Sequence, residues 1–406
     1  MTGLFATLLL PEIFFYGVGA MLMATLNIRH SYGPGAWSPV LNNVVMIATI
    51  GVFWALPGPD TLTPSSITTP QVLVLGIGTT LGIAAQALVL VPALRRTGFR
   101  WRWRFRARPN EIGRMREVGN LALWVLGYVV ASQIGVTVVA SVGGHHSGAF
   151  VVFTNADLLI QMPYGILVVS LLTALMPRLS RAAARGQHDE VVADLGLGAR
   201  LSAVALLPIT GGLIVLGQSL AIVLFAYGET SVDGARLIGT ALAASAFGLF
   251  PFAMVMLQLR VFYAMRDGRT PTLINIFMVA TKVAIVLVCA NLFDDPAKIA
   301  VSLTTATSAS YVVGAAVGHI ALTRRLGRLG FSRVLSTVVR VTIGSAVAAV
   351  AAFGIGLAMQ NLLGSGRGGA AATLSVGGLV GLVVLALVLS RMRLDELRTM
   401  AAVVRR

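Results

Sequence analysis

Residues 72–94 read VLVLGIGTTLGIAAQALVLVPAL, and residues 95–117 continue as RRTGFRWRWRFRARPNEIGRMRE. The first stretch has no charged residue and is long enough, as a helix, to cross a hydrocarbon core of about 30 Å. The second stretch has nine arginines. An apolar stretch of this length followed by an arginine-rich loop predicts a membrane-spanning helix whose next loop lies in the cytoplasm.

The same alternation runs through the whole chain of 406 residues, which is 56% hydrophobic and only 11% charged. A soluble protein of this length has more charge and shorter apolar runs. The sequence therefore predicts an all-α, polytopic membrane protein with about eleven spans. The apolar stretches are 4–27, 37–56, 72–94, 115–142, 149–176, 199–226, 236–264, 271–293, 298–322, 335–361 and 370–390.

The net charge of +16 suggests nucleic-acid binding at first sight, but the distribution of the arginines argues against it. Basic residues gather in every second loop and in the C-terminal tail, while the intervening loops have almost none. This is the positive-inside pattern, so we expect a cytoplasmic C-terminus and no nucleic-acid partner. Counting back places residue 1 outside, without a basic region before the first span. We therefore expect an odd number of spans to be missing upstream.

Motifs for catalysis and metal binding do not occur in the sequence. It has no GxxxxGK[ST], HExxH or GxSxG motif, and Cys289 is its one cysteine. The adjacent His145 and His146 do not make a metal site by themselves. We therefore expect that the protein is not an enzyme and has no cofactor or metal. Because the sequence has no ATP-binding motif, any transport would be driven by an ion gradient, the membrane potential or the substrate's own gradient.

The segment 95–117 alternates arginine with tryptophan or phenylalanine between Arg100 and Arg106. Aromatic rings and guanidinium groups both suit the headgroup layer, so this segment is predicted to be an interfacial linker that contacts anionic membrane lipids. The alternative is an ordinary basic cytoplasmic loop.

A weak internal repeat relates the first and seventh apolar stretches. Each has a proline, Pro11 and Pro251, with an alanine thirteen residues later, and each is followed by a polar turn and a second proline. From that second proline, residues 39–43 and 271–275 share Pro, Leu at +2 and Asn at +4. Two lobes of parallel topology, with a substrate between them, are a common transporter design.

Polar residues inside a span usually face a protein interior or a wet cavity. The densest set is Asn155, Asp157 and Gln161, and the spacing of four places Asp157 and Gln161 on one helix face. Pro163 and Gly165 are expected to bend the helix just below them. We interpret these polar residues as lining a substrate cavity. A polar contact between helices is the alternative.

Three further charged residues lie within apolar stretches. Asp157 lies about 12 Å from the outer end of its span and Lys282 about 16 Å from the inner end of its own, so their depths nearly match. A structural ion pair between them is our preferred hypothesis over ligand binding. Glu12 follows Pro11 and is predicted to line the outer cavity or cap a helix break. Arg260 is predicted to snorkel to the interface or to meet an anionic headgroup.

Several stretches resemble the MurJ/MviN lipid II flippases of the multidrug/oligosaccharidyl-lipid/polysaccharide exporter superfamily. They are LPEIFFYGVGAMLMATLN (10–27), WSPVLNNVVMIA (37–48), NADLLIQMPYGILVVSLLTALMPRLSRAAARGQHDE (155–190), LFAYGE (224–229) and LRVFYAMRDGRTPTLIN (259–275). The resemblance covers essentially the whole chain, and its two longest motifs are specific.

Such flippases have fourteen spans, and the resemblance begins at the fourth. It implies a two-lobed exporter fold with an incomplete N-terminal lobe at 1–94, the basic linker at 95–117 and a C-terminal lobe at 118–322. Two extra helices at 335–390 would form a lipid-tail groove, and 391–406 would be a basic cytoplasmic tail. The implied activity is transport of lipid II, a polyprenyl-pyrophosphate-linked peptidoglycan precursor, from the inner to the outer leaflet of the plasma (inner) membrane by alternating access.

Two departures from the family pattern bear on this implication. Leu158 follows Asp157 where the family commonly has arginine, and Gln161 replaces a glutamate. The cationic site is therefore elsewhere or lost. An exporter of another polyprenyl-linked glycan or of a drug stays open, as does a non-transporting scaffold. The implied partners are lipid II or a related polyprenyl-pyrophosphate glycolipid, together with cell-wall synthesis proteins.

Overall fold

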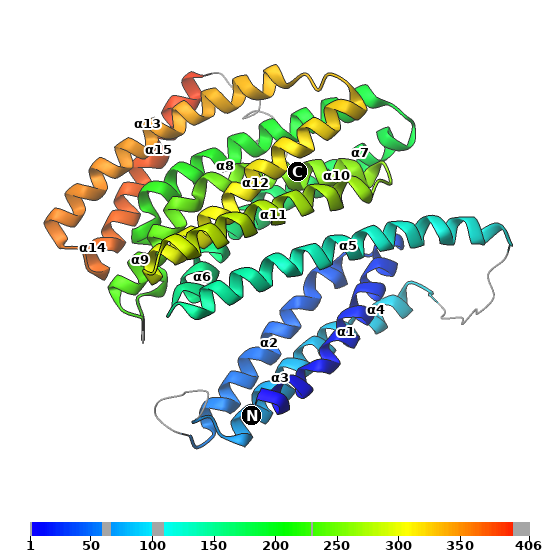
Figure 1. The fold of residues 1–406 in the computed structure, drawn as a ribbon, viewed down its shortest axis with the longest axis horizontal. Helices are drawn as coiled ribbons and strands as arrows, with labels where there is room; N and C mark the ends of the chain where they lie inside the picture. Colours follow the sequence, from blue (N-terminus) through cyan, green and yellow to red (C-terminus); the bar gives the residue numbers. More distant parts are fainter. Residues whose placement is uncertain (1, 59–65, 100–108, 229, 393–406) are drawn as a thin grey trace. The chain divides into compact units, whose positions relative to one another are not determined.

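The computed structural model describes residues 2–58, 66–99, 109–228 and 230–392 (Figure 1). Within these residues every regular element is a helix, and eleven helices or helix runs are long and apolar enough to cross a membrane. The predicted all-α fold with eleven spans is therefore confirmed. The chain divides into two compact units, Met1–Arg108 (unit 1) and Pro109–Arg406 (unit 2).

Unit 1 is built around its third helix. Its helices are α1 (Thr2–Ile28), α2 (Gly33–Ala55), α3 (Thr69–Leu88) and α4 (Leu90–Arg96). Glycines on α3 permit close packing on both sides: Gly76 faces Leu8 of α1, and Gly78 faces Thr49 of α2. The hydroxyl of Thr80 donates a 2.6 Å hydrogen bond to the backbone carbonyl of Leu8, which ties α3 to α1.

Unit 2 contains the main buried core, in which α8, α9, α10 and α12 contribute most of the large apolar side chains. The pair α13 and α15 packs against α8 on one side of this core, and α5 packs along α11 (Figure 1). The elements are α5 (Pro109–His145), α6 (Ala149–Pro163), η1 (Tyr164–Val168), α7 (Val169–Ala184), α8 (His188–Phe225), α9 (Val232–Ser245), η2 (Ala246–Gly248), α10 (Leu249–Ala264), α11 (Arg269–Leu292), α12 (Pro296–Leu326), α13 (Phe331–Leu363), α14 (Arg367–Ala372), η3 (Thr373–Gly377) and α15 (Gly378–Arg391).

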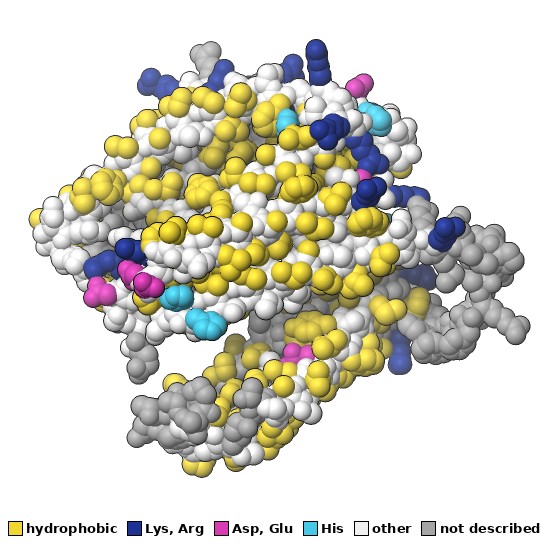
Figure 2. Space-filling model, in the orientation of Figure 1, with side chains coloured by type: hydrophobic (Ala, Val, Ile, Leu, Met, Phe, Trp, Pro, Cys, Tyr) yellow, Lys and Arg dark blue, Asp and Glu magenta, His cyan; other side chains and the backbone are white. Residues whose placement is uncertain are grey.

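Many large apolar side chains lie on the outer surface of the helices (Figure 2). Ile214, Val350 and Leu382 are each more than half exposed. Such a surface would be costly in water and is stable against lipid tails. The chain is therefore a multi-pass membrane protein.

Several helices run beyond the apolar stretches that predict them. The helix expected from residue 199 begins at His188, because the polar segment before it continues the helix and places Asp189 and Glu190 in the first turn. Acidic side chains there are stabilised by the positive end of the helix dipole. Hydrophobic length thus predicts where a span lies, whereas the helix ends depend on capping outside the hydrocarbon core.

The internal repeat reappears in the turns after α1 and α10. His30 and Arg266 both have φ of 58°, and they are the non-glycine residues of positive φ in the described part of the chain. In each turn the following residue donates its backbone N–H to a carbonyl five residues earlier: Ser31 to Leu26 at 3.0 Å, and Asp267 to Phe262 at 2.9 Å. In both cases the next helix begins three residues after the left-handed residue.

Candidate functional site

The helix that carries Asp157 changes its winding just after that residue. α6, η1 and α7 form one continuous helical run, in which Tyr164–Val168 is a π-helical turn directly after Pro163. Proline has no N–H to donate within the helix, and π turns are common at functional sites. A π turn thus lies at Pro163 and Gly165, where a bend was expected, and the bend itself stays a prediction.

Asp157 and Gln161 interact directly on this helix. Gln161 Nε2 donates a 2.5 Å hydrogen bond to Asp157 Oδ2, as expected for residues four apart on one face. Asn155 behaves differently, because its Nδ2 donates to the backbone carbonyl of Val151 at 2.9 Å. The roles of all three in substrate binding stay predictions.

Lys282 of α11 lies beside α5. A Cβ added to Gly135 of α5 would lie 3.2 Å from Lys282 Cε and 3.4 Å from Nζ, so the glycine makes room for the lysine side chain. Lys282 and Asp157 interact electrostatically. Both residues are described, and no direct ion pair joins them in the structure. Whether the two charges stabilise each other stays a prediction.

Four of the chain's seven tyrosines are linked to one another by electrostatic interaction or ring contact, and one of them, Tyr311, is also linked to Asp157. The ring of Tyr164 lies 4.4 Å from that of Phe252, which lies 4.6 Å from the ring of Tyr311. Tyr311 interacts electrostatically with Asp157 and Tyr128. The fourth, Tyr263, interacts with Tyr128.

We call this set the polar patch of unit 2: Tyr128, Asp157, Gln161, Tyr164, Arg260, Tyr263, Lys282 and Tyr311. Sequence reasoning selected none of the four tyrosines, although a signal was available for Tyr128 and Tyr311. The available signal was their depth, because both lie well inside a span and not in the interfacial belt where membrane tyrosines are common.

Arg260 supplies a second positive charge to the polar patch. It lies in the last turns of α10 and interacts electrostatically with Tyr164. Arg260 and Lys282 against Asp157 give the patch a formal net charge of +1 (two positive, one negative). This balance favours an anionic group over a cationic one.

Glu12 belongs to unit 1. Its Oε1 accepts a long 3.5 Å hydrogen bond from the Thr80 hydroxyl, whose shorter bond goes to Leu8. Glu12 is partly buried at the middle of α1. Its predicted cavity role stays a prediction within that unit.

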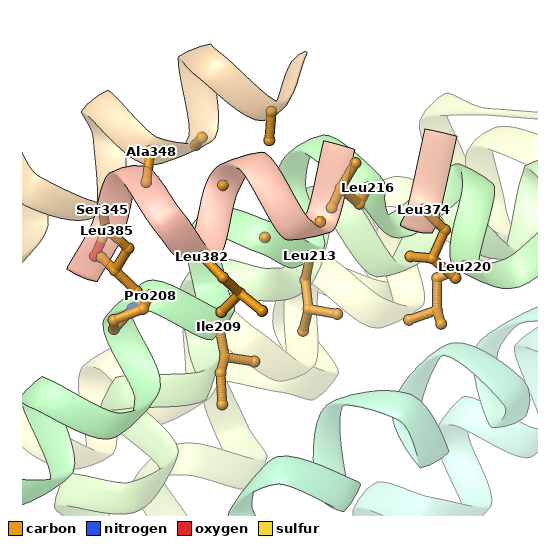
Figure 3. A pocket seen from close by; sticks show the side chains of 15 residues that line it. Pro208, Ile209, Leu213, Leu216, Leu220, Ser345, Ala348, Leu374, Leu382 and Leu385 are labelled. Carbon is orange, nitrogen blue, oxygen red and sulfur yellow. The ribbon is translucent and has the colours of Figure 1, made fainter. Parts of the chain in front are cut away.

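An apolar groove lies between α8, α13, η3 and α15 (Figure 3). We call it the first groove. Its volume is about 270 Å³. Leu374 and Leu220 lie at one end, and Pro208 and Leu385 lie at the other (Figure 3). The groove is open because several of its lining residues have little or no side chain. These are Gly212, Ala348, Ala349, Ala352, Gly378 and Gly381.

A second groove of about 480 Å³ lies between α8 and α13, and Ser345 and Ala349 line both. The two helices approach closely at Gly211, where an added Cβ would lie 3.3 Å from the Ser345 carbonyl oxygen. The first groove lies within the predicted groove segment 335–390 and also uses α8, which that prediction did not include. Binding of a lipid tail there stays a prediction.

Two predicted basic segments fall largely outside the described residues. The alternating residues 100–106 are among them, so their contact with anionic lipid stays a prediction. Residues 393–406 of the tail are also outside. The described flanks of the linker are helical, with α4 ending at Arg96 and α5 beginning at Pro109.

The described residues contain no group of three or more His, Cys, Asp or Glu side chains placed to hold a metal ion. His145 and His146 lie close to carbonyls of their own helix, with Nδ1 at 2.6 Å from Ser141 O and 2.8 Å from Val142 O.

Comparisons with known proteins agree on one family. The sequence profile described as Lipid II flippase MurJ matches residues 1–367. A protein of Rhizobium meliloti (strain 1021) named Probable lipid II flippase MurJ is 26% identical over 283 residues, covering 70% of this chain and 51% of that protein. One of Haemophilus influenzae (strain ATCC 51907 / DSM 11121 / KW20 / Rd) with the same name is 27% identical over 281 residues, covering 66% and 51%.

This chain thus spans about half the length of the curated relatives it matches. A solved structure of Lipid II flippase MurJ in the inward closed conformation covers 94% of this chain, with a TM-score of 0.67. The match covers 72% of the solved chain at 16% identity. A likeness at this identity establishes a shared fold.

Proposed function

Because this chain belongs to the lipid II flippase MurJ family, we propose that it takes part in moving a polyprenyl-pyrophosphate-linked peptidoglycan precursor from the inner to the outer leaflet. The observation that carries the proposal is the presence, in one unit, of two cationic side chains within spans, Lys282 beside Gly135 and Arg260 near the end of α10, and of a separate apolar groove. An amphiphile with an anionic head and a long hydrocarbon tail needs both kinds of site.

The polar patch is suited to the head. Arg260 and Lys282 are its cationic donors, in a chain that has Leu158 where the family commonly has arginine. Charge-assisted hydrogen bonds to phosphate oxygens are about twice as strong as neutral ones. Tyrosine hydroxyls add donors that suit sugar and peptide groups.

The first groove is suited to the tail. Its walls are almost wholly apolar, and Ser345 is the one hydroxyl residue among those that line it. A chain of isoprene units in this groove would stay in a hydrocarbon environment while the head crosses the membrane. Alternating access of the two lobes would then carry the head across.

We further propose the plasma (inner) membrane as the location, with the arginine-rich loop ends and the C-terminus in the cytoplasm. The positive-inside pattern supports this orientation. Cell-wall synthesis proteins that use the transported precursor are the proposed protein partners. An exporter of a cationic drug is disfavoured by the net positive patch, whereas export of another polyprenyl-linked glycan fits the same features.

A binding measurement tests the proposal. The purified chain is titrated with a polyprenyl-pyrophosphate glycopeptide and, separately, with the free polyprenol. We expect the pyrophosphate lipid to bind about tenfold or more tightly, and the Lys282→Met and Arg260→Gln variants to lose that preference. Arg324→Gln, at an exposed site on the end of α12 outside the patch, is the matched control. Equal affinity for both lipids would overturn the proposed role of the patch.

A further inference from the structure

A polar cavity lies at the turn between α7 and α8, at the arginine-rich end of unit 2. Its volume is about 570 Å³. Basic, acidic and histidine side chains lie together over this turn (Figure 2). We call it the turn pocket, and its polar lining is Arg178, Arg181, Arg185, Gln187, Glu190 and Asp194.

The turn is fixed by backbone hydrogen bonds. Gly186 has φ of 68°, a left-handed conformation that favours glycine. Gln187 N donates to Ala182 O at 3.0 Å, and Gly186 N donates to Ala183 O at 3.2 Å. This pair of bonds is a Schellman motif, which ends α7 and holds the start of α8 at a defined angle. Backbone hydrogen bonds therefore fix the two walls of the turn pocket relative to each other.

One ion pair holds the two walls together. Arg178 Nη2 lies 2.9 Å from Asp194 Oδ1, and the Asp194 side chain is only 6% exposed. The two charges neutralise each other. Arg178 and Asp194 thus serve the fold and leave the remaining groups of the pocket for other contacts.

The remaining charged groups have complementary signs. Arg181 lies in the last turn of α7, and Arg185 is the C-cap residue four positions further on. Both are exposed, and their guanidinium groups make no hydrogen bond or ion pair within the described chain. The Glu190 carboxylate on the facing helix also makes none. Gln187 Oε1 is buried and has no hydrogen-bond partner among the described residues. The pocket thus presents two guanidinium donors beside two unused acceptors.

We propose that the turn pocket binds a phosphoethanolamine headgroup of the adjacent membrane leaflet. The phosphate would accept hydrogen bonds from Arg181 and Arg185. The ammonium, with three N–H donors, would donate to Glu190 and Gln187 Oε1. A purely anionic headgroup would leave Glu190 facing negative charge, and a trimethylated ammonium has no N–H to donate. This site is separate from the polar patch and does not rest on the proposed flippase activity.

Lipid titration of the purified chain tests this proposal. Phosphatidylethanolamine, phosphatidylcholine and phosphatidylglycerol of identical acyl chains are added to delipidated protein, and bound lipid is measured by native mass spectrometry. We expect phosphatidylethanolamine to bind about tenfold more tightly than the other two, the effect of one hydrogen bond to a charged group. Equal binding of all three lipids would overturn the proposal.

Variants assign the effect to the turn pocket. Arg181→Gln with Arg185→Gln should abolish the binding preference, and Glu190→Gln should reduce the difference between phosphatidylethanolamine and phosphatidylcholine. Asp189→Asn and Arg324→Gln are matched controls, because both residues are exposed and neither lines the pocket. Since the substituted side chains are exposed and unpaired, the folded state should persist, and a thermal unfolding midpoint checks this. Loss of preference in the controls as well would contradict the assignment.

Soluble competitors distinguish a phosphoethanolamine headgroup from free phosphate as the ligand of the turn pocket. Phosphoethanolamine should displace the bound lipid at lower concentration than inorganic phosphate does, because only the former has the ammonium. Competition by inorganic phosphate at the same concentration would overturn the zwitterionic site and leave a simple phosphate site.

Discussion

Gln161 Nε2 donates a 2.5 Å hydrogen bond to Asp157 Oδ2, one helical turn away on α6. The bond occupies one oxygen of a carboxylate within a membrane span. Lys282 and Tyr311 interact electrostatically with the same carboxylate. Asp157 of α6 therefore interacts with charged or polar residues of two other helices of unit 2, α11 and α12.

Neutral substitutions at Asp157 and Lys282 test whether the contributions of these two residues to stability depend on each other. Lys282→Met alone leaves a carboxylate without its cation, and an uncompensated charge within a span costs about 2–4 kcal/mol. We expect the double variant Asp157→Asn, Lys282→Met to have a higher thermal unfolding midpoint than Lys282→Met alone. A double variant less stable than both single variants would show that the two side chains act independently.

Filling the first groove tests its role as a tail site. Gly212 lines this groove and has open space around an added Cβ. Gly212→Leu should occupy the groove and weaken binding of a long polyprenyl lipid about tenfold. Gly354→Leu is the control, because Gly354 also has open space and lines neither groove. Equal loss of lipid binding in the two variants would contradict the assignment.

Close packing of α8 and α9 predicts a sensitive position at Gly239. An added Cβ there would overlap the backbone of Gln218 and lie 2.7 Å from the carbonyl oxygen of Gly217. Backbone atoms cannot move aside as a flexible side chain can. We expect Gly239→Ala to lower the free energy of unfolding by about 1–3 kcal/mol. Gly212→Ala should leave it nearly unchanged, and similar losses in both would refute the packing argument.

The turn between α10 and α11 predicts a dependence of stability on pH. Asp267 accepts hydrogen bonds from the backbone N and hydroxyl of Thr270, at 3.0 and 2.7 Å, and forms an ion pair with Arg325. Burial of the Asp267 carboxyl raises its pKa, but these hydrogen bonds and the Arg325 charge outweigh burial and hold the pKa below its ordinary 3.8. A carboxyl with a lowered folded-state pKa adds stability above its unfolded pKa and loses it as the pH falls through the folded value.

Asp267→Asn should therefore cost about 1–3 kcal/mol near neutral pH. The difference from the unsubstituted protein should shrink as the pH falls below 3.8, and unfolding midpoints measured across that range check it. Asp233→Asn is the control, because the Asp233 side chain is 87% exposed and its ion pair with Arg236 should matter little. A difference that stays constant with pH would contradict the argument.

The spans and the Asp157–Gln161 contact could be predicted from the sequence because both depend on local regularities, hydrophobic length and the helical repeat. How Asp157 and Lys282 lie relative to each other could not be predicted. Equal depth in the membrane does not determine how two helices pack. The direction of the Lys282 side chain depends on the space that Gly135 leaves beside it. Tyr128 and Tyr311 were missed because one aromatic residue in an apolar span resembles a packing residue until its neighbours are known.

The turn pocket shows the same limit of sequence analysis. Its arginines and acids are visible in the sequence as a basic loop end, which the positive-inside rule explains by itself. The Schellman turn at Gly186 turns that loop end into a cavity, because it places Glu190 opposite Arg181 and Arg185. Such a pairing depends on the direction in which α8 leaves the turn.

The most direct test of the proposed flippase activity is complementation in a bacterium depleted of its own lipid II flippase. The chain is expressed alone and, in parallel, joined behind the first three helices of a longer relative, with membrane insertion verified for both. Growth and exposure of lipid II to an externally added lipid II-cleaving enzyme are measured together. We predict that at least one form restores both, and that Lys282→Met in that form does not. Failure of both correctly inserted forms would contradict the flippase assignment.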